Sequence, residues 1–335
     1  MRAEKKTASF SFLLQSFFTH RLIQQRHVSP HTISSYRDTF RLLLKFMQRR
    51  LQKSPSSMAL EEVDAPLVAA FLEDLEKSRS ISARSRNLRL TAIRSFFRYL
   101  SFEVPEQSAQ IQRVLAIPNK RYARSMIHFL TQPEADALLA APDRTTWSGR
   151  RDHALLLVAL QTGLRLSELA GLRPPDVNLG IGAHVSVVGK GRKERCTPLA
   201  KQTVAVLKEW FAEPPRLGAE RLFPNARGGP LSADGVEYIV AKHTVAARRV
   251  CPSLQNKRVT PHVLRHTTAM GLLECGVDRA VIALWLGHES VETTQIYLHA
   301  DLKLKESALA KATQSNTAPS RYRPDDQLIA FLKAL

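Results

Sequence analysis

The first third of the chain places apolar residues at intervals of three and four, the spacing that puts them on one face of an α-helix. The segment after Ser29 is the clearest case, because Ser29 suits a helix N-cap, Pro30 suits the first helical position, and an apolar stripe follows. We predict helices over about residues 9–25, 30–50, 65–77 and 82–102. This region is therefore expected to form a helical domain.

The helix predicted over residues 82–102 has two different faces. One face is apolar and would pack against a core; it carries Leu90, Ile93, Phe97 and Leu100. The other face is polar or cationic and has no acidic member; it carries Arg84, Asn87, Thr91, Arg94 and Arg98. A simple solvated surface would also produce such a stripe, but an unbroken cationic face favours contact with phosphate groups.

The pattern beyond residue 128 mixes helices with one strand pair. Thr131 and Glu134 form a capping box, and a buried helix over 152–162 ends at Gly163. Valine-rich residues 184–188 and the segment 194–199 read as two strands of a hairpin with a basic turn. Further helices are predicted after Thr260, over 278–286, and after Ser290. The fold class is therefore mainly α with a small β-hairpin.

Length and charge extend this picture. A chain of 335 residues is expected to form about two domains. The net charge of +19 favours a polyanionic partner, and residues 1–125 carry +12 of it, with 22 Lys or Arg against 10 Asp or Glu. Three scattered cysteines fit a reducing cytoplasm, and the lack of a long apolar run argues against a membrane span. These features point to nucleic acid and away from membranes.

A set of residues with phosphoryl-transfer chemistry is spread over the second region. Arg165 and Arg265 have the forked donors that clamp phosphate oxygens, and Lys190 in the hairpin turn could protonate a leaving oxygen. The remaining candidates are Glu168, which could orient Arg165 or a histidine, then His262, His288 and the late Tyr297. Two arginines, histidines and a tyrosine are the parts needed to attack a phosphodiester with a side-chain nucleophile.

Other chemistries fit these residues less well. His262 and His266 have the spacing of a zinc pair, but no glutamate follows the first histidine and no third ligand is evident. Gly189-Lys190-Gly191 lacks the pattern of a nucleotide phosphate loop. We therefore expect neither a metal nor a nucleotide cofactor.

In their order and spacing, these motifs closely resemble the tyrosine recombinase (phage integrase) family over about residues 10–310. The motifs are Thr162-Gly-Leu-Arg-x-Ser-Glu-Leu169, Gly189-Lys-Gly-x-Lys-Glu-Arg195, His262-x-Leu-Arg-His266, Leu286-Gly-His288 and Tyr297. The resemblance implies that Tyr297 is the nucleophile of a 3′-phosphotyrosyl intermediate and that Arg165 and Arg265 clamp the phosphate. It implies that His288 is a further phosphate donor, His262 an acid/base helper, Lys190 the general acid in preference to Lys193, and Glu168 a support residue.

The resemblance also implies how the chain is divided. Residues 1–115 would be a helical, SAM-like core-binding domain, 116–128 a linker, 129–312 the catalytic domain and 313–335 a tail. DNA-facing residues would be Arg84, Arg94 and Arg98, with Lys120 and Arg121 of the linker crossing a groove. The apolar tail segment 328–335 could dock on a neighbouring subunit or on its own.

The expected function is site-specific DNA recombination, by integration, excision or resolution, in a tetramer on double-stranded DNA. A type IB topoisomerase and a non-catalytic DNA-binding accessory protein are the alternatives. A second recombinase or a DNA-bending protein is a possible partner, no cofactor is implied, and the expected location is the bacterial cytoplasm at the nucleoid.

Overall fold

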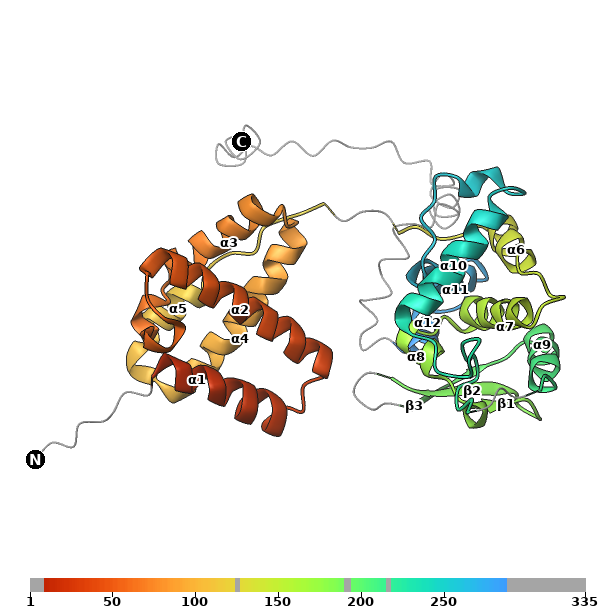
Figure 1. The fold of residues 1–335 in the computed structure, drawn as a ribbon, viewed down its shortest axis with the longest axis horizontal. Coiled ribbons are helices and arrows are strands. Elements are labelled where there is room, and N and C mark those ends of the chain that lie inside the picture. Colours follow the sequence, from red (N-terminus) through yellow and green to blue (C-terminus); the bar gives the residue numbers. More distant parts are fainter. Residues whose placement is uncertain (1–8, 124–126, 190–193, 215–217, 288–335) are drawn as a thin grey trace, which may run out of the picture. The chain divides into compact units, whose positions relative to one another are not determined.

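The computed structural model describes residues 9–123, 127–189, 194–214 and 218–287 of the chain. It divides into two compact units, one up to residue 124 and one from residue 125 (Figure 1). The break between the units falls within residues 116–128, where the sequence predicts a linker. In the described ranges, no helix is long and apolar enough to cross a membrane.

The first unit is made of helices. They are α1 (Phe10–Ser16), which continues as a wider π-type helix over Phe17–Gln25, α2 (Pro30–Leu51), α3 (Ala65–Arg79), α4 (Ala83–Glu103) and α5 (Ser108–Leu115). Short 3₁₀ turns occur at Pro55–Ser57, Leu60–Glu62 and Pro105–Gln107. The side chains of Ser29 and Ser82 accept hydrogen bonds from Thr32 N and Ser85 N and so cap α2 and α4. The four predicted helices are confirmed, whereas α5 follows Pro105 and was not predicted.

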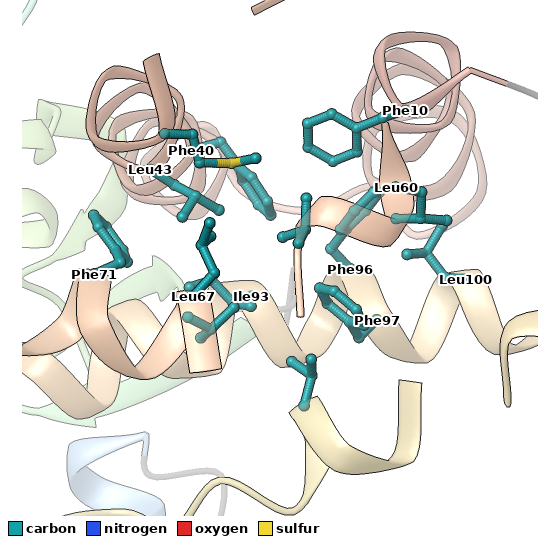
Figure 2. Close-up of a cluster of buried hydrophobic side chains, with 14 of the residues drawn as sticks. Phe10, Phe40, Leu43, Leu60, Leu67, Phe71, Ile93, Phe96, Phe97 and Leu100 are labelled. Atoms are coloured by element: carbon teal, nitrogen blue, oxygen red, sulfur yellow. The ribbon is translucent and has the colours of Figure 1, made fainter. Parts of the chain in front are cut away.

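The core of the first unit is rich in aromatic rings, which α1, α2, α3 and α4 direct toward one another (Figure 2). The ring of Phe96 on α4 meets Phe17 at a centroid distance of 5.3 Å and Phe40 at 5.4 Å, both edge to face. This is the preferred geometry of aromatic pairs. Helix α4 packs on α2, α3 and α5. Its predicted apolar face is therefore the centre of this core.

The second unit is mainly helical, with one small sheet along one edge (Figure 1). Its helices are α6 (Gln132–Ala140), α7 (Trp147–Thr162), α8 (Leu166–Gly171), α9 (Lys201–Phe211), α10 (Ala233–Ala247), α11 (Pro261–Glu274) and α12 (Arg279–Leu286). Helix α7 is buried along most of its length and packs on α6, α9 and α11. The sequence predicted its end at Gly163 but placed its start at Asp152, five residues too late, and it did not predict α8, α9 and α10.

The sheet has the antiparallel order β1 (Val177–Asn178), β2 (His184–Val188), β3 (Glu194–Pro198). Val188 pairs with Glu194, so the predicted hairpin is confirmed. Strand β1 is only two residues long, too short to give an alternating pattern in the sequence. The helix predicted after Ser290 and the tail lie outside the described residues.

Candidate active site

Arg165 is held at the turn between α7 and α8. Gly163 ends α7 with φ +61°, and a Cβ atom there would lie 2.6 Å from Leu286 Cδ2. Glycine is therefore favoured by the left-handed backbone, and any side chain there would push against Leu286 of α12. The chain leaves this turn so that Arg165 becomes the N-cap residue of α8, with its side chain one-third exposed.

Arg265 lies on α11, whose first turn is capped by the Thr260 side chain accepting a hydrogen bond from Val263 N. The side chain of Arg265 is nearly buried, at 4% exposure. Its Nη1 donates to Gly163 O at 2.5 Å and its Nη2 donates to Leu286 O at 2.7 Å. Arg265 therefore ties the turn after α7 to the end of α12.

The two arginines meet at the end of α12. Gly287 ends that helix with φ +65°, and Arg165 Nη2 donates to Gly287 O at 2.7 Å. Arg165 and Arg265 therefore hold the two consecutive carbonyls that precede His288. The guanidinium group of Arg165 has more N–H donors than its bonds to Gly287 O and Glu168 use, as phosphate binding would require.

One cleft of about 640 Å³ is lined by both arginines and by His262. His262 is exposed, and its ring contacts His266 edge to face at a centroid distance of 4.2 Å. In the part of the chain that the structure describes, no group of three or more His, Cys, Asp or Glu side chains is placed to hold a metal ion. The structure thus brings three predicted site residues together, from parts of the chain that lie about one hundred residues apart.

Glu168 supports this cluster as an ion-pair partner. Its Oε1 accepts a hydrogen bond from Arg165 Nη1 at 3.0 Å, and its Oε2 accepts one from the Arg165 backbone N at 2.7 Å. Burial alone would raise the pKa of Glu168, but hydrogen bonds from Arg195 and from Arg165 outweigh it and lower that pKa to about 2. Glu168 is therefore an anion under all ordinary conditions.

Sequence reasoning missed Arg195 as a site residue. Arg195 lies on β3, and its two Nη atoms donate to Glu168 Oε1 and Oε2 at 2.9 and 2.7 Å. The only signal in the sequence was its place at the end of the motif that contains Lys190, because an arginine on a short strand is usually a surface residue.

Three predicted site residues, Lys190, His288 and Tyr297, lie outside the described residues. The chain segments next to two of them are described. Strands β2 and β3 flank the connection that contains Lys190, and the two arginines hold the carbonyls just before His288.

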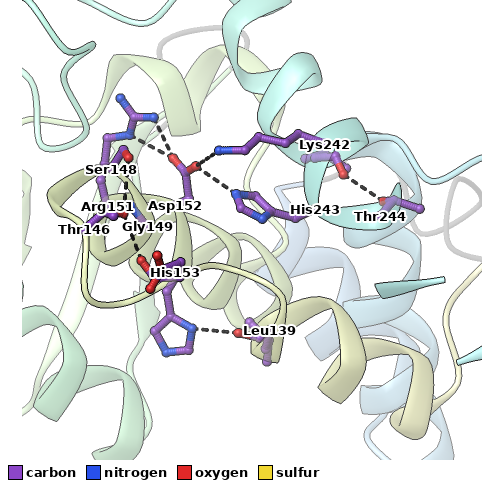
Figure 3. A network of polar contacts seen from close by, with 12 residues as sticks. Leu139, Thr146, Ser148, Gly149, Arg151, Asp152, His153, Lys242, His243 and Thr244 are labelled. Atoms are coloured by element: carbon purple, nitrogen blue, oxygen red, sulfur yellow. Dashed lines mark hydrogen bonds and ion pairs between the residues drawn. The ribbon is translucent and has the colours of Figure 1, made fainter. Parts of the chain in front are cut away.

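A second polar network lies inside the same unit, around Asp152 on α7 (Figure 3). Asp152 accepts hydrogen bonds from Arg151 Nη2 at 2.6 Å and from His243 Nε2 at 2.8 Å, and Lys242 Nζ lies 3.8 Å away. Burial opposes ionisation of Asp152, but His243 and Arg151 outweigh it and lower its pKa. The network joins α7 to α10, the helix whose Ala233 and Glu237 line the cleft.

The predicted DNA-facing residues of the first unit differ in how they are held. Arg84, Arg98 and Arg121 are exposed. Arg94, in contrast, donates to the backbone oxygen of Ile117 and to Asn119 Oδ1, the latter at 3.1 Å. Arg94 thus anchors the beginning of the linker on α4, a role that the sequence did not suggest.

Lys120 is also engaged, because its Nζ pairs with Glu76 at 2.8 Å and its backbone bonds to Asn87 in both directions. Asn87 and Arg94 of the polar stripe and Lys120 of the linker were expected to face phosphate. In the structure these three residues instead hold the linker on the helices. Their contact with DNA stays a prediction.

Comparison with known proteins identifies the family to which the chain is similar. Residues 128–303 match the phage integrase family, and residues 15–103 match the phage integrase N-terminal SAM-like domain. The chain is 66% identical over 330 residues to a putative integrase/recombinase, y4rC, of Sinorhizobium fredii, covering 98% of this chain and 99% of that protein.

It is 35% identical over 292 residues to the tyrosine recombinase XerC of Pelobacter propionicus, covering 86% of this chain and 91% of that protein. The fold is also that of the XerH site-specific recombinase bound to a palindromic difH substrate, with a TM-score of 0.66 at 24% identity, over 85% of this chain and 81% of that one. Together with the paired arginines in one cleft, these matches show that the chain belongs to the phage integrase family of tyrosine recombinases, which break and rejoin DNA.

Proposed function

We propose that this chain is a site-specific recombinase that cleaves and rejoins DNA strands through Tyr297. The observation that carries the proposal is the placement of Arg165, Arg265 and His262 around one cleft. Two guanidinium groups there can bind the non-bridging oxygens of a phosphodiester, whose negative charge spreads over these oxygens in the transition state.

The proposed reaction is balanced without any cofactor. The Tyr297 oxygen attacks the scissile phosphorus, a tyrosyl–phosphate bond forms, and the bond from phosphorus to the 5′ oxygen breaks. His262 takes up the tyrosine proton, Lys190 gives a proton to the leaving 5′ oxygen, and His288 adds a donor to the phosphate. Attack by a 5′ hydroxyl on the phosphotyrosine reverses these steps and rejoins the strand.

The first unit would grip the duplex. Its exposed Arg84, Arg98 and Arg121 and the net charge of +12 in residues 1–125 supply cationic groups for phosphate contact. The recombinase would act as a tetramer on two double-stranded sites, with the tail at 313–335 exchanged between neighbouring subunits. A second recombinase or a DNA-bending protein would be a further partner, and the site of action would be the bacterial nucleoid in the cytoplasm.

The test uses a supercoiled plasmid that carries the DNA flanking the gene for this chain, incubated with the purified protein in EDTA. We expect covalent protein–DNA adducts, trapped with detergent, and recombinant products. Tyr297→Phe should abolish both, because the nucleophilic oxygen is lost. Tyr238→Phe is the matched control, because Tyr238 is an exposed tyrosine of α10 and should leave adduct formation intact.

Three results would contradict parts of the proposal. An adduct that survives Tyr297→Phe would remove the nucleophile assignment. Relaxation of the plasmid without recombinants would favour a type IB topoisomerase, and binding without any adduct would favour an accessory DNA-binding protein. Unchanged recombination after deletion of residues 313–335 would refute the exchanged tail.

A further inference from the structure

Two arginines pair with Glu168, and Arg195 is the less exposed of the two. Its side chain is 10% exposed and that of Glu168 is 8% exposed, so this is a nearly buried ion pair. Both terminal nitrogens of Arg195 donate to the two oxygens of one carboxylate, the geometry that fixes both groups in orientation. A pair this buried loses much hydration, a cost that its mutual attraction and hydrogen bonds must offset.

The pair belongs to a closed ring of four residues from four parts of the unit. Arg195 on β3 holds Glu168 on α8, and Glu168 holds Arg165 at the turn after α7. Arg165 donates to the carbonyl of Gly287 at the end of α12. Gly287 closes the ring because its backbone lies against the Arg195 guanidinium. A Cβ atom added to Gly287 would be only 2.6 Å from Arg195 Nη1.

The ring also sets the net charge beside the cleft. A pair of Arg165 and Glu168 alone would be neutral, and its carboxylate would repel a phosphate in the cleft. With Arg195 added, the three side chains carry a net single positive charge. Because the pKa of Glu168 is about 2, this balance holds at every ordinary pH.

We propose that Arg195 is a positioning residue of the phosphate clamp: it neutralises Glu168 and fixes it, so that Arg165 keeps both its orientation and its charge for the phosphate. This inference rests on the proposed function. Arg165, and not Arg195, lines the cleft with Arg265 and His262, so Arg195 acts through Glu168 and does not touch the phosphate.

The test compares Arg195→Gln with Arg195→Lys on the plasmid described above, with DNA binding and the rate of adduct formation measured separately. We expect Arg195→Gln to slow adduct formation roughly 10- to 100-fold at saturating protein, the scale of a small misplacement of a catalytic group. Binding should change less than about twofold, because many other cationic groups hold the duplex. Arg195→Lys keeps the charge and should recover part of the rate.

The matched control is Arg150→Gln. Arg150 forms a two-bond pair with Glu213 in the same unit but lines no part of the cleft. It should lose stability without a change in the rate of adduct formation. Thermal melting of each variant separates loss of folding from loss of rate.

The decisive variant is Glu168→Gln combined with Arg195→Gln. Removing the carboxylate restores the single positive charge on Arg165, so the double variant should form adducts faster than Arg195→Gln alone. A merely structural role for Arg195 predicts the reverse, since two supports are then lost. A wild-type rate for Arg195→Gln, or a double variant no faster than the single one, would overturn the proposal.

A crystal structure of the Arg195→Gln variant tests the positioning independently of activity. We expect the Arg165 guanidinium to leave Gly287 O and turn fully onto Glu168. An unchanged Arg165 would overturn the proposal even if the wild-type protein formed no adduct, whereas that failure of the wild type would count against the proposed function alone.

Discussion

The two units of this chain are stabilised by different kinds of interior. In the described part of the first unit the buried side chains are apolar and aromatic, with Thr39 and Arg86 as the polar exceptions. Among its described residues, the second unit buries eleven that are polar or charged: Glu134, Arg151, Asp152, His153, Thr162, Thr197, Thr203, His243, Thr244, Arg265 and Thr268. The comparison teaches that an apolar core is sufficient to hold the helices of the first unit together, whereas the second unit must also hold charged groups in fixed positions.

This difference has an energetic cost that falls mainly on the second unit. Buried charges are stable only while every partner is present, and loss of one partner leaves the others unpaired. An aromatic core loses only packing and apolar burial when one ring is trimmed. The second unit should therefore respond more sharply to single polar substitutions and to acid.

The largest effect is expected for Asp152→Ala, which leaves Arg151 and His243 without their shared anion. We expect a loss of about 3–5 kcal/mol in the free energy of unfolding of the second unit. Urea denaturation followed by tryptophan fluorescence measures it, since Trp147, Trp210 and Trp285 all belong to that unit. Lys242→Ala is the control in the same unit, because Lys242 is half exposed and its pair with Asp152 at 3.8 Å should contribute less than about 1 kcal/mol. Equal midpoints for the two variants would contradict the comparison.

A somewhat smaller effect is expected for Leu43→Ala in the apolar core of the first unit, where Leu43 is fully buried. The loss should be about 2–4 kcal/mol, from the cavity and the lost apolar burial. Hydrogen exchange read by mass spectrometry should show faster exchange in peptides of α2 and α4, while the tryptophan signal keeps its urea midpoint. A shift of that midpoint would show that the two units share their stability.

Acid should weaken the second unit before the first. In the described residues, Glu134, Asp152 and Glu168 of the second unit are buried carboxylates with lowered pKa values. A lowered pKa means that the stabilisation is present above the unfolded value and is lost as pH falls through the folded value. For Glu168 this window runs from 4.5 down to about 2.

The measurement is tryptophan fluorescence at a series of pH values, with hydrogen exchange reporting on the first unit. Glu168→Gln should reduce the pH dependence across that window. Loss of the first unit at a higher pH than the second would be the opposite of what the buried carboxylates require.

The smallest effect concerns two arginines of α4. Arg98 is exposed, so Arg98→Gln should lower the slope of log affinity against log salt by about one unit for duplex DNA. Arg94→Gln is the matched variant, and it should instead release the linker that Arg94 holds at Ile117 O. Fluorescence anisotropy with a labelled duplex over a range of salt concentrations distinguishes them. Equal slopes for both variants would mean that Arg94 also reaches the DNA.

Local patterns were sufficient for much of the fold. Capping residues such as Ser29 and Thr260, the apolar spacing of α4 and the glycine ends at Gly163 and Gly287 mark helices because each acts within one turn. Strand β1 and helices α5, α8, α9 and α10 were not predicted. Two residues are too few for a strand pattern, and helices α5, α8 and α9 begin without a clear capping signal in the sequence.

The candidate site was predictable in its residue types but not in its connections. Arg165, Glu168, His262 and Arg265 follow from motif order, and the structure places three of them on one cleft. Arg195 and the Asp152 network could not be found from the sequence, because their partners lie far along the chain. The contacts of Arg94 with the linker could not be predicted for the same reason.

The sequence by itself determined the helices with clear caps or apolar stripes, the hairpin, the excess of positive charge and the ordered set of phosphate-binding and nucleophilic residues. These depend on spacing along the chain and on the chemistry of single side chains. Only the tertiary structure decided that Arg165 and Arg265 line the cleft while Arg195 supports Glu168. It also decided which carbonyls the two cleft arginines hold before His288. The reason is physical: a guanidinium binds whichever acceptor the packing of distant helices brings within about 3 Å, and spacing along the chain carries no record of that distance.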